Sequence, residues 1–247
     1  GTTEQYDGGT NTWTTRPSMA TGRARATAVY LPTTNKVLVC AGSDAASTAL
    51  TSCERYDVAT NTWASAAPMN TTRPIGFSLV AMPAGTKALL VDNTTQSYAY
   101  DGAANTWSPI ASLVSTAPLF SFTTATLGDG RIMVAGGGSP VPGVGSVSNK
   151  AVSLYNPTSN TWAAAAAMTN ARVFARSVVV GGKVFVSGGF AWCPVSSGFT
   201  ACNTKTTEVF DPATGVWTPG ADVAQQPTET NTLPPTTTER ANTRALV

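Results

Sequence analysis

Hydrophobic and polar residues alternate over short stretches of this sequence, and turn-forming residues separate the stretches. Residues 26–32 (ATAVYLP) alternate small and apolar side chains, and residues 36–42 (KVLVCAG) form a short apolar run that ends in glycine. Residues 52–57 (SCERYD) alternate again, and residues 62–66 (TWASA) follow a turn. Short alternating runs bounded by turn residues are typical of β-strands. The pattern predicts four strands, named a, b, c and d in chain order.

One pattern from this unit recurs along the chain. It reads EQYDGGTNTW at its first occurrence and ERYDVATNTW at its second, with an aromatic residue seven positions before a tryptophan. Successive tryptophans of the pattern lie 44 to 55 residues apart, which indicates a repeat architecture. The pairs are Tyr6 and Trp13, Tyr56 and Trp63, Tyr100 and Trp107, Tyr155 and Trp162, and Phe210 and Trp217.

The turn between strands c and d explains most of the repeated pattern. The residue two positions before each tryptophan is Asn11, Asn61, Asn105, Asn160 or Gly215. Asparagine and glycine tolerate a positive φ, so we expect a left-handed turn position there. We expect each tryptophan to start strand d and to bury its ring between neighbouring sheets. The residues six positions after the tryptophans are predicted to be core: Met19, Met69, Leu113, Met168 and Val223.

The remaining parts of the unit complete a recognisable combination. Apolar strands end in VLVCAG, IMVAGG and VFVSGG, and an arginine follows the methionine by four positions at Arg23, Arg73 and Arg172. With the Tyr-Asp turn and the tryptophan, this combination resembles the kelch repeat, over Glu4 to about Val223. The resemblance implies an all-β, kelch-like β-propeller with one four-stranded sheet per blade around a central channel.

We expect a single propeller domain over residues 1–247, with four complete four-stranded blades and a fifth split between the termini. RANTRALV at residues 240–247 matches RVFARSVV at residues 172–179, which makes it strand a of the fifth blade. Strand b of that blade is missing, so either the chain is a fragment of a larger propeller or another segment supplies the strand. The expected blades are residues 1–19 plus 240–247, 20–69, 70–113, 114–168 and 169–223, with 224–239 as a long Thr/Pro-rich loop.

Composition narrows the function classes. Only 11% of the residues are charged and the net charge is +2, so bulk electrostatics indicate no nucleic-acid partner. No run of about 18 apolar residues occurs, so we expect no membrane insertion. The cysteines form two local pairs, and the chain has no histidine to complete a zinc site. Cys40–Cys53 and Cys193–Cys202 are predicted as disulfides of an extracellular or cell-surface protein, with free buried thiols as the alternative.

The long loops are the first candidate for function. The a–b and c–d turns lie on one face and are short, whereas the b–c and d–a loops share the other face and are long and irregular. The b–c loop at residues 190–205 carries Phe190, Trp192 and Phe199 around Cys193 and Cys202. These aromatic residues are candidates for stacking on a sugar or packing on a protein. The alternative is that they pack against the neighbouring blade.

The arginines are the second candidate. In kelch propellers, arginines at this motif position line the channel mouth and bind acidic partners. The resemblance extends that role to Arg23, Arg73, Arg172 and Arg240, with Ala117 breaking the ring in the third repeat. The alternative is that each arginine pairs with an acid of its own blade, such as Glu54 or Glu208.

The absence of histidine bears on catalysis. It excludes Ser-His-Asp and Cys-His pairs and histidine metal sites, so we predict no catalytic residue, no metal and no cofactor. The secreted copper-radical oxidases use a kelch-like propeller, but this chain cannot supply their histidine ligands. We expect a binding or adhesion protein that recognises a protein or glycan, with association through the incomplete blade as a further role. The alternatives are an accessory propeller domain of a larger extracellular enzyme and a self-assembling structural module.

Overall fold

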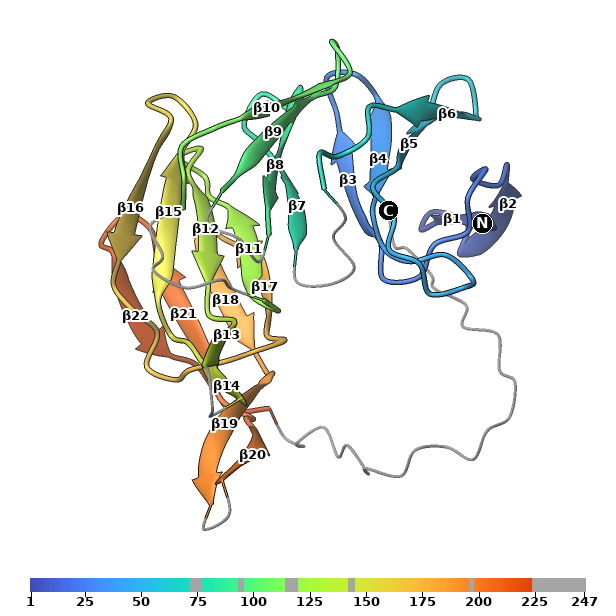
Figure 1. Cartoon of the computed structure of the whole chain (residues 1–247). Helices are drawn as coiled ribbons and strands as arrows, with labels where there is room; N and C mark the ends of the chain where they lie inside the picture. Colours follow the sequence, from blue (N-terminus) through green and yellow to red (C-terminus); the bar gives the residue numbers. More distant parts are fainter. Residues whose placement is uncertain (72–76, 93–95, 114–119, 142–144, 196–197, 224–247) are drawn as a thin grey trace.

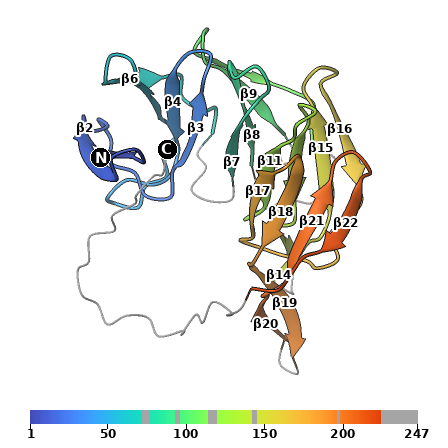
Figure 2. The same cartoon turned by 180° about the vertical axis from the view of Figure 1, so that it is seen from behind.

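The described part of the chain consists of β-strands and connecting loops. The computed structural model describes residues 1–71, 77–92, 96–113, 120–141, 145–195 and 198–223, and within them are 22 strands and no helix. The strands form four four-stranded antiparallel sheets and three two-stranded pairs. Each four-stranded sheet is one blade, and successive blades stand side by side in an arc (Figures 1 and 2). The predicted all-β propeller fold is confirmed.

The first two blades have the predicted four strands in the predicted order. In each blade the strands are hydrogen-bonded in the order a, b, c, d, so strand c lies between strands b and d. Blade 1 consists of β3 (Thr27–Leu31), β4 (Lys36–Cys40), β5 (Cys53–Asp57) and β6 (Thr62–Ala66). Blade 2 consists of β7 (Ser78–Ala81), β8 (Lys87–Val91), β9 (Tyr98–Asp101) and β10 (Thr106–Pro109).

The next two blades repeat this order and add a hairpin between strands b and c. Blade 3 consists of β11 (Thr123–Thr126), β12 (Ile132–Ala135), β15 (Val152–Asn156) and β16 (Thr161–Ala165). Blade 4 consists of β17 (Arg176–Val180), β18 (Lys183–Ser187), β21 (Thr207–Asp211) and β22 (Val216–Pro219). The added hairpins are β13 (Gly138–Val141) with β14 (Gly145–Ser148), and β19 (Phe190–Val195) with β20 (Gly198–Asn203).

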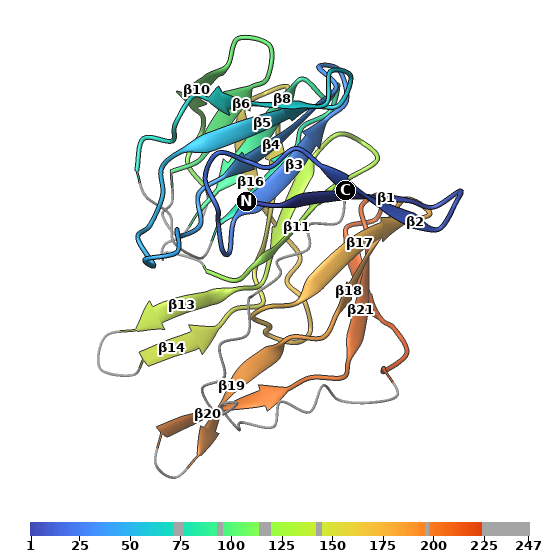
Figure 3. The same cartoon turned by 90° about the vertical axis from the view of Figure 1, so that its right-hand side faces the viewer.

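The hairpins correct the expectation that the b–c loops are irregular. Both hairpins project from the same end of the blades (Figure 3), and β14 lies beside β19 of the next blade. Their sequences are rich in Gly, Ser and Pro, which mark loops in sequence. Backbone pairing across each hairpin, which those side chains do not signal, gives these segments regular structure.

The N-terminal segment forms half of a blade. β1 (Thr3–Asp7) and β2 (Thr12–Arg16) pair in the register of strands c and d, with Tyr6 opposite Trp13. The indole Nε1 of Trp63 in blade 1 donates to the carbonyl of Pro17 at 2.8 Å, which ties the half blade to its neighbour. The expected strand a at residues 240–247 lies outside the described residues.

The core lies between the blades rather than in one central mass. In blades 2 and 3, strand b is apolar on both faces because a neighbouring sheet covers each face. Leu89 and Ile132 are fully buried there, and Leu38 and Val184 are fully buried in blades 1 and 4. The innermost strands β3, β7, β11 and β17 contact one another in sequence. Short polar side chains join them, with Ser78 Oγ 2.9 Å from Thr124 Oγ1 and Thr123 Oγ1 2.7 Å from Ser177 Oγ.

Candidate functional site

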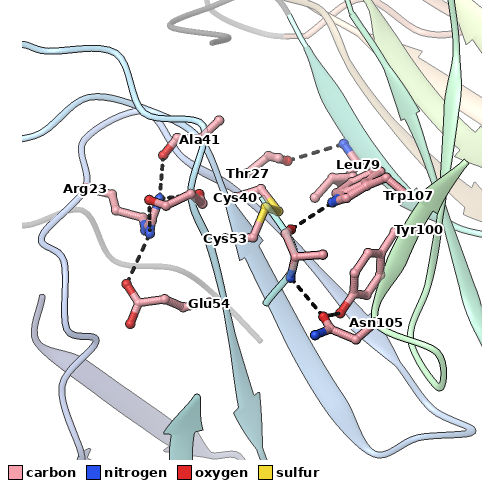
Figure 4. Close-up of a disulfide and its surroundings, with 12 residues drawn as sticks. Arg23, Thr27, Cys40, Ala41, Cys53, Glu54, Leu79, Tyr100, Asn105 and Trp107 are labelled. Atoms are coloured by element: carbon pink, nitrogen blue, oxygen red, sulfur yellow. Dashed lines mark hydrogen bonds and ion pairs between the residues drawn. A yellow bond between two sulfur atoms is a disulfide. The ribbon is translucent and has the colours of Figure 1, made fainter. Parts of the chain in front are cut away.

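The arginine that opens blade 1 is locked inside the blade. Arg23 Nη1 donates to the carbonyls of Ala41 (3.1 Å) and Ser52 (2.8 Å), and Nη2 donates to Ser52 Oγ (2.9 Å) and Glu54 Oε1 (3.1 Å) (Figure 4). Its side chain has no exposed surface. Glu54 also accepts the backbone N–H groups of Ala20 and Thr21. Arg23 and Glu54 therefore clamp the d–a loop to strands b and c.

Blade 4 has the same clamp. Arg172 Nη2 donates to Glu208 Oε1 at 3.0 Å, and Nη1 donates to the carbonyls of Gly188 and Thr206. Burial raises the pKa of Glu208, but the N–H of Thr169 and the Arg172 guanidinium outweigh burial, and the net pKa is below its ordinary value. An ionised carboxylate and a guanidinium thus satisfy each other without solvent.

These contacts correct the expectation that Arg23 and Arg172 line the channel mouth. Both residues follow the alternative and pair with an acid of the same blade. Neither arginine side chain has any exposed surface. Arg73 and Arg240 lie outside the described residues. Ala117, the position expected to break the ring, also lies outside the described residues.

The c–d turns are scaffold, as the sequence predicts. All the positions expected to be left-handed have positive φ: Asn11 (54°), Asn61 (57°), Asn105 (56°), Asn160 (52°) and Gly215 (72°). In blade 2, Asn105 Oδ1 accepts the Tyr100 hydroxyl (2.8 Å) and the N–H of Ala67 in the preceding d–a loop (2.9 Å) (Figure 4). Trp107 Nε1 donates to the carbonyl of the same Ala67 at 2.9 Å. The turn thus fastens each blade to the blade before it.

The motif side chains are not equally buried. Met69, Leu113 and Met168 are core as expected, and Tyr100, Tyr155 and Phe210 are 1 to 2% exposed. Met19 and Val223 are half-buried. Tyr6 and Trp13 are 39% and 40% exposed, which corrects the expectation that all the motif aromatics are core. The tryptophans of the later blades donate to carbonyls of the blade before them, and the described residues contain no blade before β1 and β2.

Both predicted disulfides are present. Cys40 and Cys53 face each other across β4 and β5, with Cα atoms 4.2 Å apart, and both are almost fully buried. Cys193 and Cys202 join β19 and β20 at a Cα separation of 5.9 Å, where both are half-buried. The second disulfide braces the hairpin that carries the candidate aromatic residues.

Aromatic side chains gather at the base of that hairpin. Phe190 stacks on Phe174 with ring centroids 5.7 Å apart, and Trp192 meets Phe190 edge-on at 5.2 Å. The N–H of Trp192 donates to Ser148 Oγ of the neighbouring hairpin at 2.6 Å. Phe190 and Trp192 are half-buried, whereas Phe174 is 53% exposed. The side chain of Phe199 lies outside the part that the structure describes.

Sequence reasoning did not single out Phe174, which belongs to a set of equivalent loop positions. Arg25, Ser121 and Phe174 each stand two residues before strand a and directly after a bridged residue, and each has a φ of 54° to 58°. A left-handed position costs a residue other than glycine on the order of 1 kcal/mol. Blade geometry requires it here, since the N–H of Phe174 donates to the carbonyl of Ser121 at 2.8 Å. A constant backbone thus presents different side chains beside the innermost strands.

A hollow lies on the same face at blade 1. It has a volume of about 460 Å³ and is lined by Gly1, by residues 20–24 of the d–a loop and by residues 43–45 of the b–c loop. Asp44 is the acidic side chain in this lining. The face formed by the b–c and d–a loops therefore combines a hollow, two hairpins and a partly exposed aromatic cluster.

The described residues contain neither a metal-ligand cluster nor a membrane-spanning helix. Within them, no three His, Cys, Asp or Glu side chains come close enough together to hold a metal ion. No helix in the same residues could cross a membrane. The arrangement of the b–c and d–a face suits contact with a ligand surface.

Comparison with known proteins agrees with this architecture. The family model described as Kelch motif matches residues 23–70 and 171–223, which are blades 1 and 4. Blades 1 and 4 are therefore kelch repeats. Each of these two repeats contains a buried arginine–glutamate clamp. No curated protein matches the sequence.

Solved structures share the fold of these kelch repeats at low sequence identity. The structure of YjhT is similar with a TM-score of 0.69 and 14% identity, over 87% of this chain and 75% of YjhT. A fungal alcohol oxidase of the AA5 family, in complex with copper, is similar with a TM-score of 0.68 and 20% identity. That match covers 89% of this chain but 48% of the oxidase, so the chain spans about half the length of that enzyme.

Proposed function

We propose that the chain is an extracellular binding module that recognises a protein or glycan through the face formed by its b–c and d–a loops. The observation that carries the proposal is the aromatic cluster of Phe174, Phe190 and Trp192 on that face. Phe174 exposes half of its surface from a left-handed backbone position. The backbone of this position is set by the blade, so the aromatic side chain is what distinguishes Phe174 from its equivalents Arg25 and Ser121. An exposed aromatic ring beside other aromatic rings is typical of a surface that packs on a ligand.

The surroundings of the cluster support a binding role. The clamps and the Cys193–Cys202 disulfide hold the loops rigidly, which limits the entropy lost when a ligand binds. Low charge and abundant Thr and Asn suit a ligand that is read by stacking and hydrogen bonds rather than by net charge. Two disulfides favour an oxidising compartment outside the cell.

The test uses the full chain and two arrays, one of oligosaccharides and one of purified extracellular proteins. For any ligand found, we expect Phe174→Ala to weaken binding by about tenfold, the loss of one aromatic anchor. The backbone bond to Ser121 is kept, so thermal stability should not fall. Val216→Ser is the matched control, because Val216 is 52% exposed on a c–d turn of the opposite face.

Two results would contradict the proposal. One is that neither array yields a ligand. The other is that Phe174→Ala and Val216→Ser bind equally well. Removing the whole β19–β20 hairpin sharpens the second result. Binding should be lost while the melting temperature stays nearly unchanged, and a joint loss would mean that the aromatic residues are core.

A second candidate function is an accessory propeller domain of a larger extracellular enzyme. The similarity to about half of the fungal alcohol oxidase favours it. Because this chain has no histidine, the histidine ligands of a copper site would have to lie in another domain. The sequence of the parent gene tests this candidate, since a histidine-rich neighbouring domain would support it and an anchor or further repeats would not.

A further inference from the structure

A three-residue motif occurs twice in this sequence, both times in a loop of blade 2. The pattern Asn-x-Ser/Thr, where x is not proline, is the acceptor motif for N-linked sugars. It occurs at residues 70–72 and at residues 93–95, both with the sequence NTT. The asparagines of the c–d turns, such as Asn61, have tryptophan at the third position, and Asn156 is followed by proline. Residues 93–95 lie outside the described residues, so the structural argument concerns Asn70.

Asn70 lies on the surface of the d–a loop that leads from β6 to β7. It directly follows Met69, which is buried in the core. The side of the loop that carries Asn70 and Thr71 is exposed. A glycan is bulky and has to stand in solvent, so the position of Asn70 meets the first requirement of an acceptor.

The equivalent loop positions of blades 1 and 4 serve the buried clamps. Ala20 and Thr169 directly follow the methionine of their repeats, as Asn70 does. The N–H of Ala20 donates to Glu54 at 2.7 Å. The N–H of Thr169 donates to Glu208 at 2.6 Å. In these two blades the loop is therefore fastened through its backbone to a carboxylate that is almost fully buried.

Blade 2 fastens the same loop in a different way. Tyr98 occupies the position of the clamp glutamate, two residues before Tyr100 of strand c. Asn70 Nδ2 donates to the Tyr98 hydroxyl at 2.6 Å, and this contact lies at the surface. The change from glutamate to tyrosine and the presence of asparagine thus bring the side-chain amide of the loop out of the interior.

The contact with Tyr98 is compatible with a sugar on Asn70. The side-chain nitrogen of an asparagine carries two hydrogens, and N-glycosylation replaces one of them. The remaining N–H is sufficient for the bond to the Tyr98 hydroxyl. The folded loop therefore keeps its attachment to strand c when the sugar is present.

The neighbouring b–c connection is short in this blade. Residues 92–97 join β8 to β9, whereas residues 41–52, 136–151 and 188–206 join strands b and c in the other three blades. The two longest of these connections form the projecting hairpins (Figure 3). Blade 2 thus places the least chain beside its d–a loop, which leaves space for a large group on Asn70.

We propose that Asn70 is the acceptor of an N-linked glycan. In the transfer, Nδ2 of Asn70 attacks C1 of the first sugar of an oligosaccharide that is carried on a polyprenyl diphosphate. The Nδ2–C1 bond forms, the C1–O bond to the diphosphate breaks with its electron pair on the diphosphate oxygen, and one Nδ2 proton leaves to a base. This site rests on the extracellular location proposed above, since the motif is modified in secreted proteins.

The experiment expresses the full chain behind a cleavable secretion signal in a eukaryotic host. Peptide N-glycosidase in heavy-oxygen water converts each glycosylated asparagine into a labelled aspartate, which mass spectrometry of the peptides locates. We expect the label at Asn70 in most molecules. Asn170 is the internal control, because it is exposed on the equivalent loop of blade 4 but has arginine at the third position. Its Nδ2 also contacts a hydroxyl, that of Thr206 at 3.5 Å, and it should carry no label.

Variants at the third motif position separate glycosylation from the structural role of Asn70. Thr72→Ala breaks the motif and leaves Asn70 and Tyr98 unchanged, whereas Thr72→Ser keeps the motif. Every chain compared also carries Asn93→Gln, so that the second motif contributes no sugar. The label at Asn70 should be lost in Thr72→Ala and kept in Thr72→Ser.

The state of the disulfides distinguishes the two ways in which the proposal can fail. An unlabelled Asn70 in chains whose Cys40–Cys53 disulfide has formed overturns the proposal and leaves the extracellular location standing. A label that persists in Thr72→Ala also overturns it. Cysteines that stay reduced in the secretory pathway contradict the extracellular location itself, and this proposal falls with it. None of these readings depends on finding a ligand for the b–c and d–a face.

Discussion

Replacing Arg172 by methionine removes the guanidinium of the blade 4 clamp and keeps most of the aliphatic stem. Four acceptors then lose a donor inside the protein: the carbonyls of Gly188 and Thr206, the Thr206 hydroxyl and the carboxylate of Glu208. Arg172 has no exposed side-chain surface, so water cannot replace it without a rearrangement. The variant therefore tests whether this arginine holds the blade or serves a ligand.

The size of the effect follows from the burial of the pair. Breaking a buried ion pair by removing one partner costs about 3–5 kcal/mol, because the other charge stays buried and uncompensated. Glu208 keeps the N–H groups of Thr169 and Asn170, which places the expected cost near the lower limit. Adding Glu208→Gln to Arg172→Met should recover about 1–2 kcal/mol by removing the orphaned charge.

The assay is guanidinium unfolding of the full chain at 25 °C, with equal denaturant slopes as the condition for comparing variants. Arg176→Met is the matched control, because Arg176 lies four residues away and is exposed. Its guanidinium makes a 3.4 Å contact with the adjacent carbonyl of Ala175. We expect the control to leave the midpoint unchanged.

A loss below about 1 kcal/mol for Arg172→Met would refute this reasoning, since that is the range of an exposed pair. Arg172 would then be accessible, and the idea that these arginines bind an acidic partner at the channel mouth would return.

Three further predictions address the scaffold. Blade 4 has Phe210 and Gly215 where blade 2 has Tyr100 and Asn105. In urea unfolding, the double variant Tyr100→Phe, Asn105→Gly should be about 1 kcal/mol more stable than the summed losses of the two single variants predict. Strict additivity would contradict the hydrogen bond between the two side chains. Under mild reductant, alkylation and mass spectrometry should find Cys193–Cys202 opened before the buried Cys40–Cys53, and the reverse order would contradict the burial difference. The pKa of Glu208 is below its ordinary value of 4.5. The stability that its carboxylate contributes is therefore complete above pH 4.5 and is lost as the pH falls through the folded-state pKa. In Glu208→Gln the free energy of unfolding should depend less on pH below 4.5, and an unchanged slope would show that the carboxylate is not held ionised.

Local chemistry made much of the scaffold predictable. The left-handed turn positions follow from Asn and Gly two residues before each tryptophan, because few other residues adopt that backbone at low cost. The disulfide partners are close in sequence and lie on neighbouring strands, with Cys40 directly opposite Cys53 and Cys193 diagonal to Cys202. The blade order follows from the repeat, since each copy places the same side chains on the same strands.

The functional face was harder to predict because long-range contacts decide it. The environment of Arg172 depends on carbonyls that lie 16 and 34 residues away in the chain. The sequence alone therefore could not decide between pairing with Glu208 and lining the channel mouth. The hairpins β13–β14 and β19–β20 form by backbone pairing, which a sequence rich in Gly, Ser and Pro does not predict. Phe174 becomes noticeable only when the strand bridges align it with Arg25 and Ser121.

The central claim is that the exposed aromatic residues of the b–c and d–a face serve recognition, whereas the motif residues of the c–d turns serve stability alone. Its most direct test measures dissociation constant and melting temperature together for Phe174→Ala and Trp217→Ala, with a ligand selected on the arrays. The account predicts that Phe174→Ala binds about tenfold more weakly with an unchanged melting temperature. It predicts the opposite for Trp217→Ala, since Trp217 fastens blade 4 to the carbonyl of Ala166 at 2.8 Å. Equal losses of binding and stability in both variants would contradict it.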